Sequence, residues 1–333
     1  MTVANHEEEA AILDAVGKWL ERDVRPHVLE LEHADTYPAE MVEQMKALGL
    51  FGATIATEHG GLGLSATTYA KIVQTVSEVW MSLAGIFNSH LIMAACVQRV
   101  GTEEQKRQYL PRFATGELRG GLALTEPDCG TDLQAIRTRA VRSGNDAYVV
   151  NGTKTWISNG IHGQVFALLV KTDPSAEPRH KGMSMLLVEK GPGFRVSRKL
   201  EKLGYKGIDS GELIFEDFRV PASALIGRVE GRGLQTALGG LELGRINVAA
   251  RGNRTWTFMV YLNEGMEGGG TRFTELGHTF QPKTGMALIW NSLHPDRKPN
   301  LGTKHSGEPV TSGHKVIITK WFRAIGEGPV FHD

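Results

Sequence analysis

The sequence predicts an α+β protein of several domains: a helical bundle, then an antiparallel β-domain, then a shorter β-rich segment. Three observations predict this fold class. Apolar residues repeat with a helical period over the first 118 residues, alternate with a period of two from about Leu122, and change in composition after Arg251. The length of 333 residues suits about two domains. The predicted segments are 1–119, 120–230, 231–251 and 252–333.

The helical region contains several apolar stripes with recognisable ends. Ser65 and Thr102 are expected N-caps, and Thr102 forms a capping box with Gln105. Residues 83–100 are apolar on most sides, as in a helix buried inside a bundle that ends at Gly101. The stripes are Ile12, Leu13, Val16, Trp19 and Leu20; Met41, Met45 and Leu48; Tyr69, Ile72, Val73 and Val76; and Tyr109, Leu110 and Phe113.

The middle region reads as short strands separated by glycine and proline. The pair Asn151-Gly152 predicts a hairpin between residues 148–151 and 152–158, because this dipeptide is the strongest short hairpin signal. A helix is expected at about 233–250. The further expected strands are 165–171, 183–189, 194–198 and 212–218, followed by 254–263, 286–291 and 316–321.

Charge and cysteine content narrow the kinds of partner. Lysine plus arginine and aspartate plus glutamate each number 37, so the basic footprint of a nucleic-acid-binding protein is absent. We expect no membrane partner, since no run of about 18 apolar residues occurs and the first ten residues are acidic. Two cysteines, Cys96 and Cys129, fit a reducing compartment. A cytoplasmic location is therefore expected.

Ordered motifs within residues 7–251 resemble the acyl-CoA dehydrogenase family. The matching segments are 89–106, 109–111, 116–117, 122–132, 154–160 and 211–221. The resemblance implies a helical N-terminal domain, a β-barrel-like middle domain, and FAD held between the middle domain and a four-helix C-terminal domain. It also implies an acyl-CoA substrate and leaves a homo-oligomer open.

Site residues carry over from that family by motif position. Those expected at FAD are Leu122, Leu124, Thr125, Gly130, Thr131, Trp156, Ile157 and Ser158. Those expected at acyl-CoA are Thr131, Glu242 and Arg245. From composition alone the first of these segments also reads as an ordinary glycine and proline loop, and Trp156 equally reads as a core residue.

The catalytic base of the family has no assigned residue here. A carboxylate removes the α-proton of the thioester while FAD accepts the hydride. Some members place this glutamate where the present sequence has Gly244, and others place it in helices beyond the point where the resemblance ends, near Gly252. We therefore expect impaired α,β-dehydrogenation. If the chain were active, a carboxylate of the following segment, such as Glu264 or Glu275, would have to act as the base.

Residues from Gly252 onward resemble the C-terminal half of prolyl 4-hydroxylases. The matching segments are 252–263, 267–273, 282–285, 293–296, 305–310 and 315–321. The resemblance implies a partial double-stranded β-helix that uses Fe(II), 2-oxoglutarate and ascorbate. It makes His305 an iron ligand and Lys315 the partner of a 2-oxoglutarate carboxylate. Without that resemblance, both would be read as solvent-exposed residues.

Iron in such enzymes needs two histidines and one carboxylate. The family's H-x-D pair lies upstream of the strand near Arg254, where this chain carries the other family's sequence. Three H-x-[DE] instances occur, which is little above chance: His6 with Glu8, His33 with Asp35, and His294 with Asp296. Two alternatives to an acyl-CoA dehydrogenase thus stay open, an incomplete dioxygenase and a catalytically inactive fusion or ligand-binding fragment.

Overall fold

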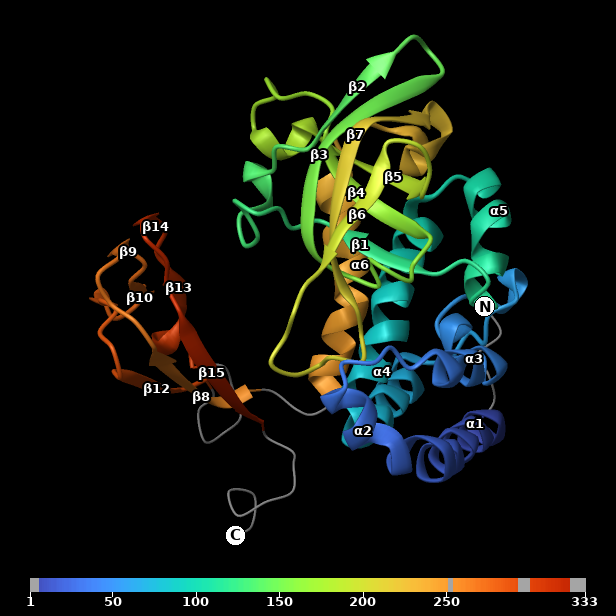
Figure 1. Ribbon diagram of the computed structural model, residues 1–333, viewed down its shortest axis with the longest axis horizontal. Coiled ribbons are helices and arrows are strands. Elements are labelled where there is room, and N and C mark those ends of the chain that lie inside the picture. The colour runs from blue at the N-terminus through green and yellow to red at the C-terminus, as the bar shows by residue number, and fades with distance from the viewer. Residues whose placement is uncertain (1–5, 251–253, 293–299, 324–333) are drawn as a thin grey trace. The chain divides into compact units, whose positions relative to one another are not determined.

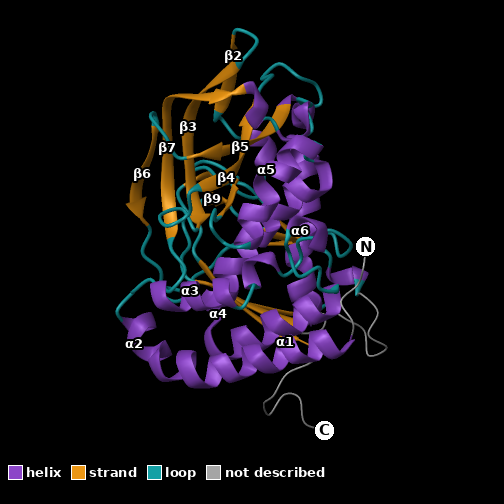
Figure 2. Ribbon diagram, turned by 90° about the vertical axis from the view of Figure 1, so that its right-hand side faces the viewer, coloured by secondary structure: helices purple, strands orange, loops and turns teal. Residues whose placement is uncertain are grey.

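The structure is a computed structural model that describes residues 6–250, 254–292 and 300–323. Its contacts divide the chain into two compact units, Met1–Asn247 and Val248–Asp333. The first unit is a helical layer beside a curled, mixed β-sheet (Figures 1 and 2). The second unit consists of short antiparallel strands.

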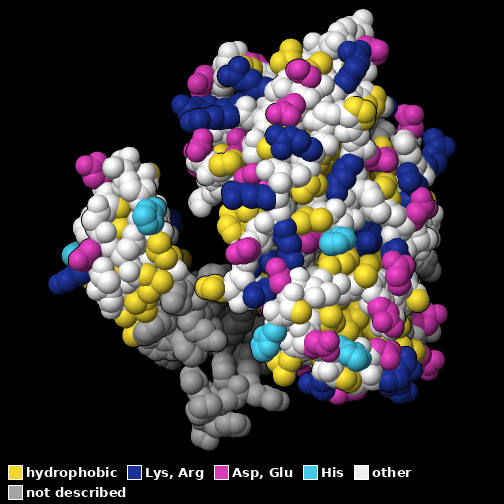
Figure 3. All heavy atoms as spheres, viewed as in Figure 1, with side chains coloured by type: hydrophobic (Ala, Val, Ile, Leu, Met, Phe, Trp, Pro, Cys, Tyr) yellow, Lys and Arg dark blue, Asp and Glu magenta, His cyan; other side chains and the backbone are white. Residues whose placement is uncertain are grey.

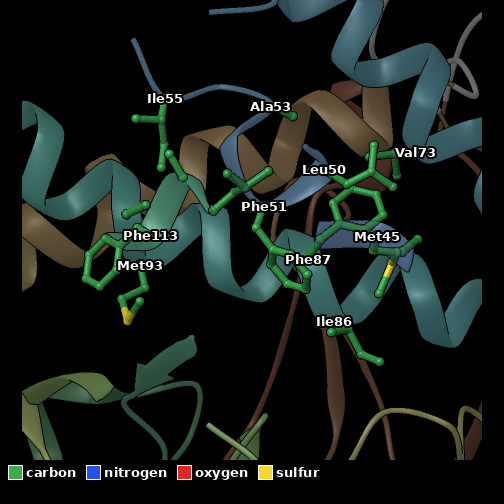
Figure 4. Packing of buried hydrophobic residues seen from close by; sticks show 14 of the residues in the cluster. Met45, Leu50, Phe51, Ala53, Ile55, Val73, Ile86, Phe87, Met93 and Phe113 are labelled. Carbon is green, nitrogen blue, oxygen red and sulfur yellow. The ribbon is translucent and has the colours of Figure 1, made fainter. Parts of the chain in front are cut away.

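The helical layer is built around one long helix, α4. The helices are α1 (His6–Trp19), α2 (Val28–His33), α3 (Ala39–Ala47), α4 (Ala66–Val100), α5 (Glu103–Ala114) and α6 (Gly233–Ala250). The predicted caps are present, since Ser65 accepts from the Thr68 N–H and Thr102 forms the capping box with Gln105. Trp80 has φ −152° and ψ 103°, which kinks α4 between the two predicted stretches. Apolar side chains of α4, including Phe87 and Met93, pack against Phe51 and Phe113 in the core (Figure 4).

Among the described residues, one helix is long and apolar enough to span a membrane by length and composition. This helix is α4, and 72% of its most apolar window is buried inside the protein. Burial of this extent is what the core helix of a bundle requires. On the face of the first unit seen in Figure 3, basic and acidic side chains are interspersed.

The sheet of the first unit has the strand order β1-β4-β2-β3-β7-β6, with β5 paired to β4. Its strands are β1 (Gly120–Ala123), β2 (Arg139–Ser143), β3 (Ala147–Ser158), β4 (Val165–Lys171), β5 (Met183–Glu189), β6 (Phe194–Lys199) and β7 (Ser210–Pro221). The prediction of a wholly antiparallel domain is wrong, because β4 runs parallel to β1 and, at one residue pair, to β2. The β2–β3 hairpin lies between β1 and β4 in sequence, so their pairing is non-local and strand periodicity could not reveal it.

The predicted hairpin at Asn151-Gly152 is also wrong. Strand β3 runs through both residues, and its pairing with β7 shifts register between Val150 and Gly152. Gly152 has φ +148°, and the Asn151 side chain exchanges hydrogen bonds with Asp217 on β7. The dipeptide therefore forms a β-bulge, which uses the same glycine freedom as a tight turn.

The second unit packs two three-stranded sheets, β12-β8-β15 and β11-β10-β13, and has a separate β14-β9 pair. The strands are β8 (Arg254–Tyr261), β9 (Glu267–Gly268), β10 (Thr271–Phe273), β11 (His278–Phe280), β12 (Ala287–Asn291), β13 (His305–Gly307), β14 (Val310–Ser312) and β15 (Ile317–Arg323). Its small core includes Met259, Tyr261, Phe273, Leu288 and Trp290. These strands follow α6 directly in sequence.

Candidate functional site

An open groove of about 480 Å³ lies on the curled sheet of the first unit. One wall is the loop of residues 125–130, which leaves β1. The other sides are Thr155 and Trp156 of β3 and Arg198 and Glu212 of β6 and β7. A backbone hydrogen bond of 2.9 Å from Thr155 N to Thr125 O joins the loop to β3. The two segments singled out in the sequence therefore meet at one groove.

Trp156 is held out of the protein core. Its side chain is 55% exposed, so the alternative of a core tryptophan is wrong. It has φ +59° in a stretch of β3 where the pairing with β7 shifts register between Lys154 and Ile157. A bulky residue in the left-handed region costs free energy and is retained only where the surroundings enforce it. The bulge thus presents an indole ring at the groove.

A buried ion pair fixes the loop. Lys154 is fully buried, and its Nζ lies 2.8 Å from Glu126 Oε1 and donates to Leu124 O at 2.9 Å. The Glu126 carboxylate also accepts from the backbone N–H groups of Arg137 and Thr138, at 2.6 and 3.0 Å. Burial alone would raise the pKa of Glu126, but the Lys154 ammonium and these hydrogen bonds hold this pKa below its usual value. The carboxylate is therefore ionised and structural.

Gly130 lines the groove, and the packing of the protein around it does not require a glycine. A Cβ built there would meet only Thr125 Cγ2, at 3.5 Å, which is ordinary contact. A glycine that the protein's own packing does not require suits a place where backbone approaches a ligand closely. The groove thus combines a flat aromatic ring, a bare backbone and hydroxyl groups, which fits a planar, polar ligand such as a flavin.

The other described residues predicted at FAD or acyl-CoA are not among those that line this groove. Leu122 and Leu124 pack partly buried against the helical core, and Ile157 is buried in the core of the sheet. Ser158 is half-buried at the end of β3, and Thr131 is exposed just beyond the groove-lining residues. The side chains of Glu242 and Arg245 on α6 lie outside the described part of the structure.

Sequence reasoning missed Arg198, Glu212 and the ion pair of Glu126 with Lys154. Arg198 Nη2 lies 3.4 Å from Glu212 Oε2 across β6 and β7. Strands β6 and β7 are distant in sequence from residues 125–130 and from Thr155 and Trp156. Local spacing therefore could not predict that Arg198 and Glu212 reach the groove. Lys154 carried one available signal, since a lysine facing inward from a predicted strand requires a buried acidic partner.

In the second unit, His305 begins β13 and is exposed. Its Nδ1 lies 2.9 Å from the carbonyl oxygen of Thr303, so a neutral ring donates from Nδ1 and keeps the Nε2 lone pair. Its ring contacts those of Phe273 and Trp290. Within residues 6–250, 254–292 and 300–323, no group of three or more metal-ligating side chains is placed to hold a metal. These residues therefore do not fit an iron site.

The structure describes only part of the three H-x-[DE] pairs. His294 and Asp296 lie outside the described residues, as does the side chain of His6. His33 ends α2 in the first unit, where Asp35 forms an ion pair of 2.8 Å with Lys199.

Lys315 is half-buried among polar groups of the second unit. Its Nζ lies 3.5 Å from Thr271 Oγ1 and 5.2 Å from the centre of the Tyr261 ring. Burial lowers the pKa of Lys315, while Glu308 acts in the opposite direction. The Tyr261 hydroxyl donates to Thr271 Oγ1 at 2.6 Å. Because the Tyr261 proton is donated within the protein, this cluster offers the Lys315 ammonium and the Thr271 hydroxyl to a carboxylate.

Family models match most of the first unit. Residues 6–117 match the acyl-CoA dehydrogenase N-terminal domain, and residues 121–218 match the acyl-CoA dehydrogenase middle domain. The first unit belongs to the acyl-CoA dehydrogenase family. Residues 244–323 match the 2OG-Fe(II) oxygenase superfamily, so the chain joins the two families, as the motifs predicted.

Curated relatives and solved structures match the acyl-CoA dehydrogenase part. The chain is 34% identical to mitochondrial isovaleryl-CoA dehydrogenase of Pongo abelii, covering 73% of this chain and 58% of the relative. It is 37% identical to acryloyl-CoA reductase (NADH) of Anaerotignum propionicum, and the match covers 73% of this chain and 62% of the relative. The crystal structure of acyl-CoA dehydrogenase from Geobacillus kaustophilus superposes with a TM-score of 0.68 at 38% identity, covering 74% of this chain and 65% of that one. The chain thus spans about three fifths of the length of these relatives.

Proposed function

We propose that the first unit binds FAD in the groove beside Trp156 and acts in the redox chemistry of acyl-CoA thioesters with impaired turnover. The observation that carries this proposal is the exposed Trp156 ring, held at a left-handed backbone position against the loop of residues 125–130. FAD is the cofactor expected of the acyl-CoA dehydrogenase family.

The substrate class follows from the relatives. One is named a dehydrogenase of isovaleryl-CoA and another a reductase of acryloyl-CoA, so both carry out redox chemistry on an acyl thioester. Bound FAD would supply the hydride acceptor. The residues of this chain would position that group: Trp156 against its flat face, and residues 125–130 along its edge.

Turnover is proposed to be impaired because no base is assigned. Gly244 has no carboxyl group, and the chain continues from α6 into strand β8. Losing a general base typically costs about 10²- to 10⁴-fold in rate.

Flavin absorbance and fluorescence titrations of the purified chain test the proposal. We expect weak, saturable FAD binding, with Trp156→Ala weakening it about tenfold, the upper end of an aromatic contact. Gly130→Ala should also weaken binding, because the added methyl group occupies ligand space and not protein space. Trp156→Phe is the matched control and should retain most of the affinity.

Equal FAD affinity in Trp156→Ala and the unmodified chain would contradict the groove assignment. Stoichiometric FAD retained through gel filtration would contradict the weak binding. Thermal melting of each variant separates loss of the ligand site from loss of the fold, since both substituted residues make few packing contacts.

A second candidate function rests on Lys315. We propose that the second unit binds the distal carboxylate of 2-oxoglutarate through Lys315, with the hydroxyl groups of Tyr261 and Thr271 beside it. The partial double-stranded β-helix is part of the same proposal. Calorimetric titration with 2-oxoglutarate, without metal, should show binding that Lys315→Met abolishes and Lys315→Arg partly retains.

Two further properties are proposed. The small number of cysteines favours a cytoplasmic protein, which cell fractionation would test. A homo-oligomer is proposed from the family and is tested by sedimentation equilibrium.

A further inference from the structure

The groove beside Trp156 has one surface on which a ring can stack. Trp156 is the one aromatic side chain among the described residues that line this groove. Its ring is 55% exposed and stands at a left-handed backbone position, with φ +59°. Such a side chain stacks on one ring system, whereas FAD carries two, the isoalloxazine and the adenine. The groove therefore has a stacking surface for only one half of the dinucleotide.

The isoalloxazine is the ring that the remaining lining fits. It has an apolar dimethylbenzene end and a polar pyrimidine end, whereas adenine has no apolar end. Pro127 and Cys129 give the groove an uncharged side, because burial and the Glu126 carboxylate raise the pKa of the Cys129 thiol and keep it neutral. Thr125 and Thr155 add hydroxyl groups to the same lining. A ring with two unlike ends matches this lining.

Each carboxylate that lines the groove already has a cation beside it. The lining therefore carries no net positive charge, which a site for phosphate groups requires. Three ion pairs balance it: Glu126 with Lys154 at 2.8 Å, Asp128 with Arg137 at 3.0 Å, and Glu212 with Arg198 at 3.4 Å.

Arg198 is the one cation among the described lining residues, and it is not free for a phosphate. A phosphate that approached its guanidinium would also approach the Glu212 carboxylate, so attraction and repulsion would offset each other. The Arg198 side chain is 66% exposed, and salt screens the attraction that remains. The phosphate groups of FMN and FAD therefore gain little from this groove.

We propose that the groove recognises the isoalloxazine ring alone, so that it binds the uncharged flavins lumiflavin and riboflavin as tightly as FMN and FAD. This inference rests on the function proposed above for the groove, and it narrows the recognised ligand from a dinucleotide to a ring. Lumiflavin is the ring-only member of the series, because it has a methyl group in place of the ribityl chain.

Equilibrium dialysis of the full chain against lumiflavin, riboflavin, FMN and FAD tests the proposal. The four dissociation constants should agree within about twofold, because all four ligands present the same ring and an exposed charge pair adds little. The ratio of FMN to riboflavin affinity should not change with salt concentration. ADP, which carries the other half of FAD, should not displace riboflavin. Trp156→Ala should weaken the binding of all four flavins by the same factor.

Glu212→Gln isolates the part that charge plays, because it removes the carboxylate that occupies Arg198 and keeps the size of the side chain. In this variant FMN should gain about two- to fivefold over riboflavin, as expected when an exposed cation becomes free for a phosphate. Glu216→Gln is the matched control. It frees Arg195 on the same two strands, but neither residue of that pair lines the groove, so the ratio should stay the same.

The outcomes separate this inference from the function on which it rests. A preference for FMN or FAD over riboflavin above about fivefold would overturn the inference and leave flavin binding established. Displacement of riboflavin by ADP, or an unchanged ratio in Glu212→Gln, would overturn it as well. No saturable binding of any of the four flavins would overturn both the inference and the proposed function. Melting temperatures close to that of the unmodified chain show that the variants are folded.

Discussion

At the scale of single residues, Glu126 and Lys154 decide where the ligand loop lies. Neither needs to touch a ligand to matter, because the ion pair and two backbone hydrogen bonds tie the loop after β1 to β3 and to residues 137–138. Burying two charges is costly unless both are paired and hydrogen-bonded, and here both are. The pair therefore positions Thr125 opposite Thr155.

Glu126→Gln should lower the free energy of unfolding by about 3 kcal/mol, because it leaves the Lys154 ammonium buried without its counter-charge. Urea denaturation followed by circular dichroism measures this change. Glu216→Gln, which breaks an exposed ion pair with Arg195, is a matched control and should change stability by less than about 1 kcal/mol. Similar losses in the two variants would show that the Glu126 carboxylate is not structurally important.

The same carboxylate predicts how stability depends on pH. The folded-state pKa of Glu126 lies below its ordinary value of 4.5. Its contribution is therefore complete above the unfolded-state pKa and is lost as the pH falls through the folded-state pKa. The pKa of Glu32 is lowered as well. Burial alone would raise this pKa, but hydrogen bonds from Lys206 N, Trp80 and Gly207 N lower it.

Melting temperatures measured between pH 7 and pH 3 should thus fall below about pH 4.5, and the fall should be shallower in Glu126→Gln. An identical pH dependence in the two proteins would exclude Glu126 as a source of the acid sensitivity.

At the scale of elements, bulges on β3 shape the groove. Gly152 adopts φ +148°, and a Cβ there would approach Thr138 Oγ1 to 2.5 Å and Thr138 Cα to 2.7 Å. The second register shift, beyond Lys154, is where Trp156 leaves the sheet. Bulges commonly turn a side chain towards a site in this way.

Gly152→Ala should lower the free energy of unfolding by about 2 kcal/mol, since the methyl group meets backbone that cannot yield. Gly144→Ala, in the β2–β3 turn, is the control. Its φ of +67° makes alanine strained by about 1 kcal/mol, but its only near neighbour is Asp146 Oδ1 at 3.3 Å. A smaller loss at Gly152 than at Gly144 would contradict the close packing at the bulge.

Elements governed by neighbours in sequence could be predicted, and those governed by distant partners could not. The caps at Ser65 and Thr102 follow from side chains three residues from their partners. The dipeptide Asn151-Gly152 predicts a backbone conformation that needs glycine, but this conformation occurs both in hairpins and in bulges. Here the pairing of β3 with β7 determines that a bulge forms. The same holds for the groove. Its two motifs could be recognised in the sequence, whereas Arg198 and Glu212 line the groove only because the sheet brings β6 and β7 to it.

At the scale of the whole molecule, the chain joins parts of two oxidoreductase families. Each unit has its own core, so each has a fold that its own residues sustain. The segment after α6 forms β-strands and matches the 2OG-Fe(II) oxygenase superfamily, as its motifs predicted.

Acyl-CoA oxidation should therefore not exceed background. Chain loaded with FAD and mixed without oxygen with butyryl-CoA, isovaleryl-CoA or octanoyl-CoA should keep its absorbance near 450 nm, because Gly244 provides no base. Bleaching within seconds would contradict this expectation. Glu264→Gln and Glu275→Gln would then show whether an acid of the second unit supplies the base.

Turnover of 2-oxoglutarate should also be absent. A facial iron site needs three ligands, and among the described residues no group of three ligating side chains forms around His305. Succinate release by the pure chain with Fe(II), ascorbate and 2-oxoglutarate should match a control without protein. Release that His305→Ala abolishes would instead establish an iron site and make His294 and Asp296 the first ligands to test.

The exposed indole on β3 gives the protein an optical property of its own. Among the tryptophans whose side chains are described, Trp19, Trp80 and Trp290 are buried and Trp156 is 55% exposed. Emission from Trp156 should be shifted to longer wavelength and be open to collisional quenching by iodide, while the buried rings should be shielded. Iodide quenching that disappears on Trp156→Phe would make this residue an intrinsic reporter of whatever covers the groove.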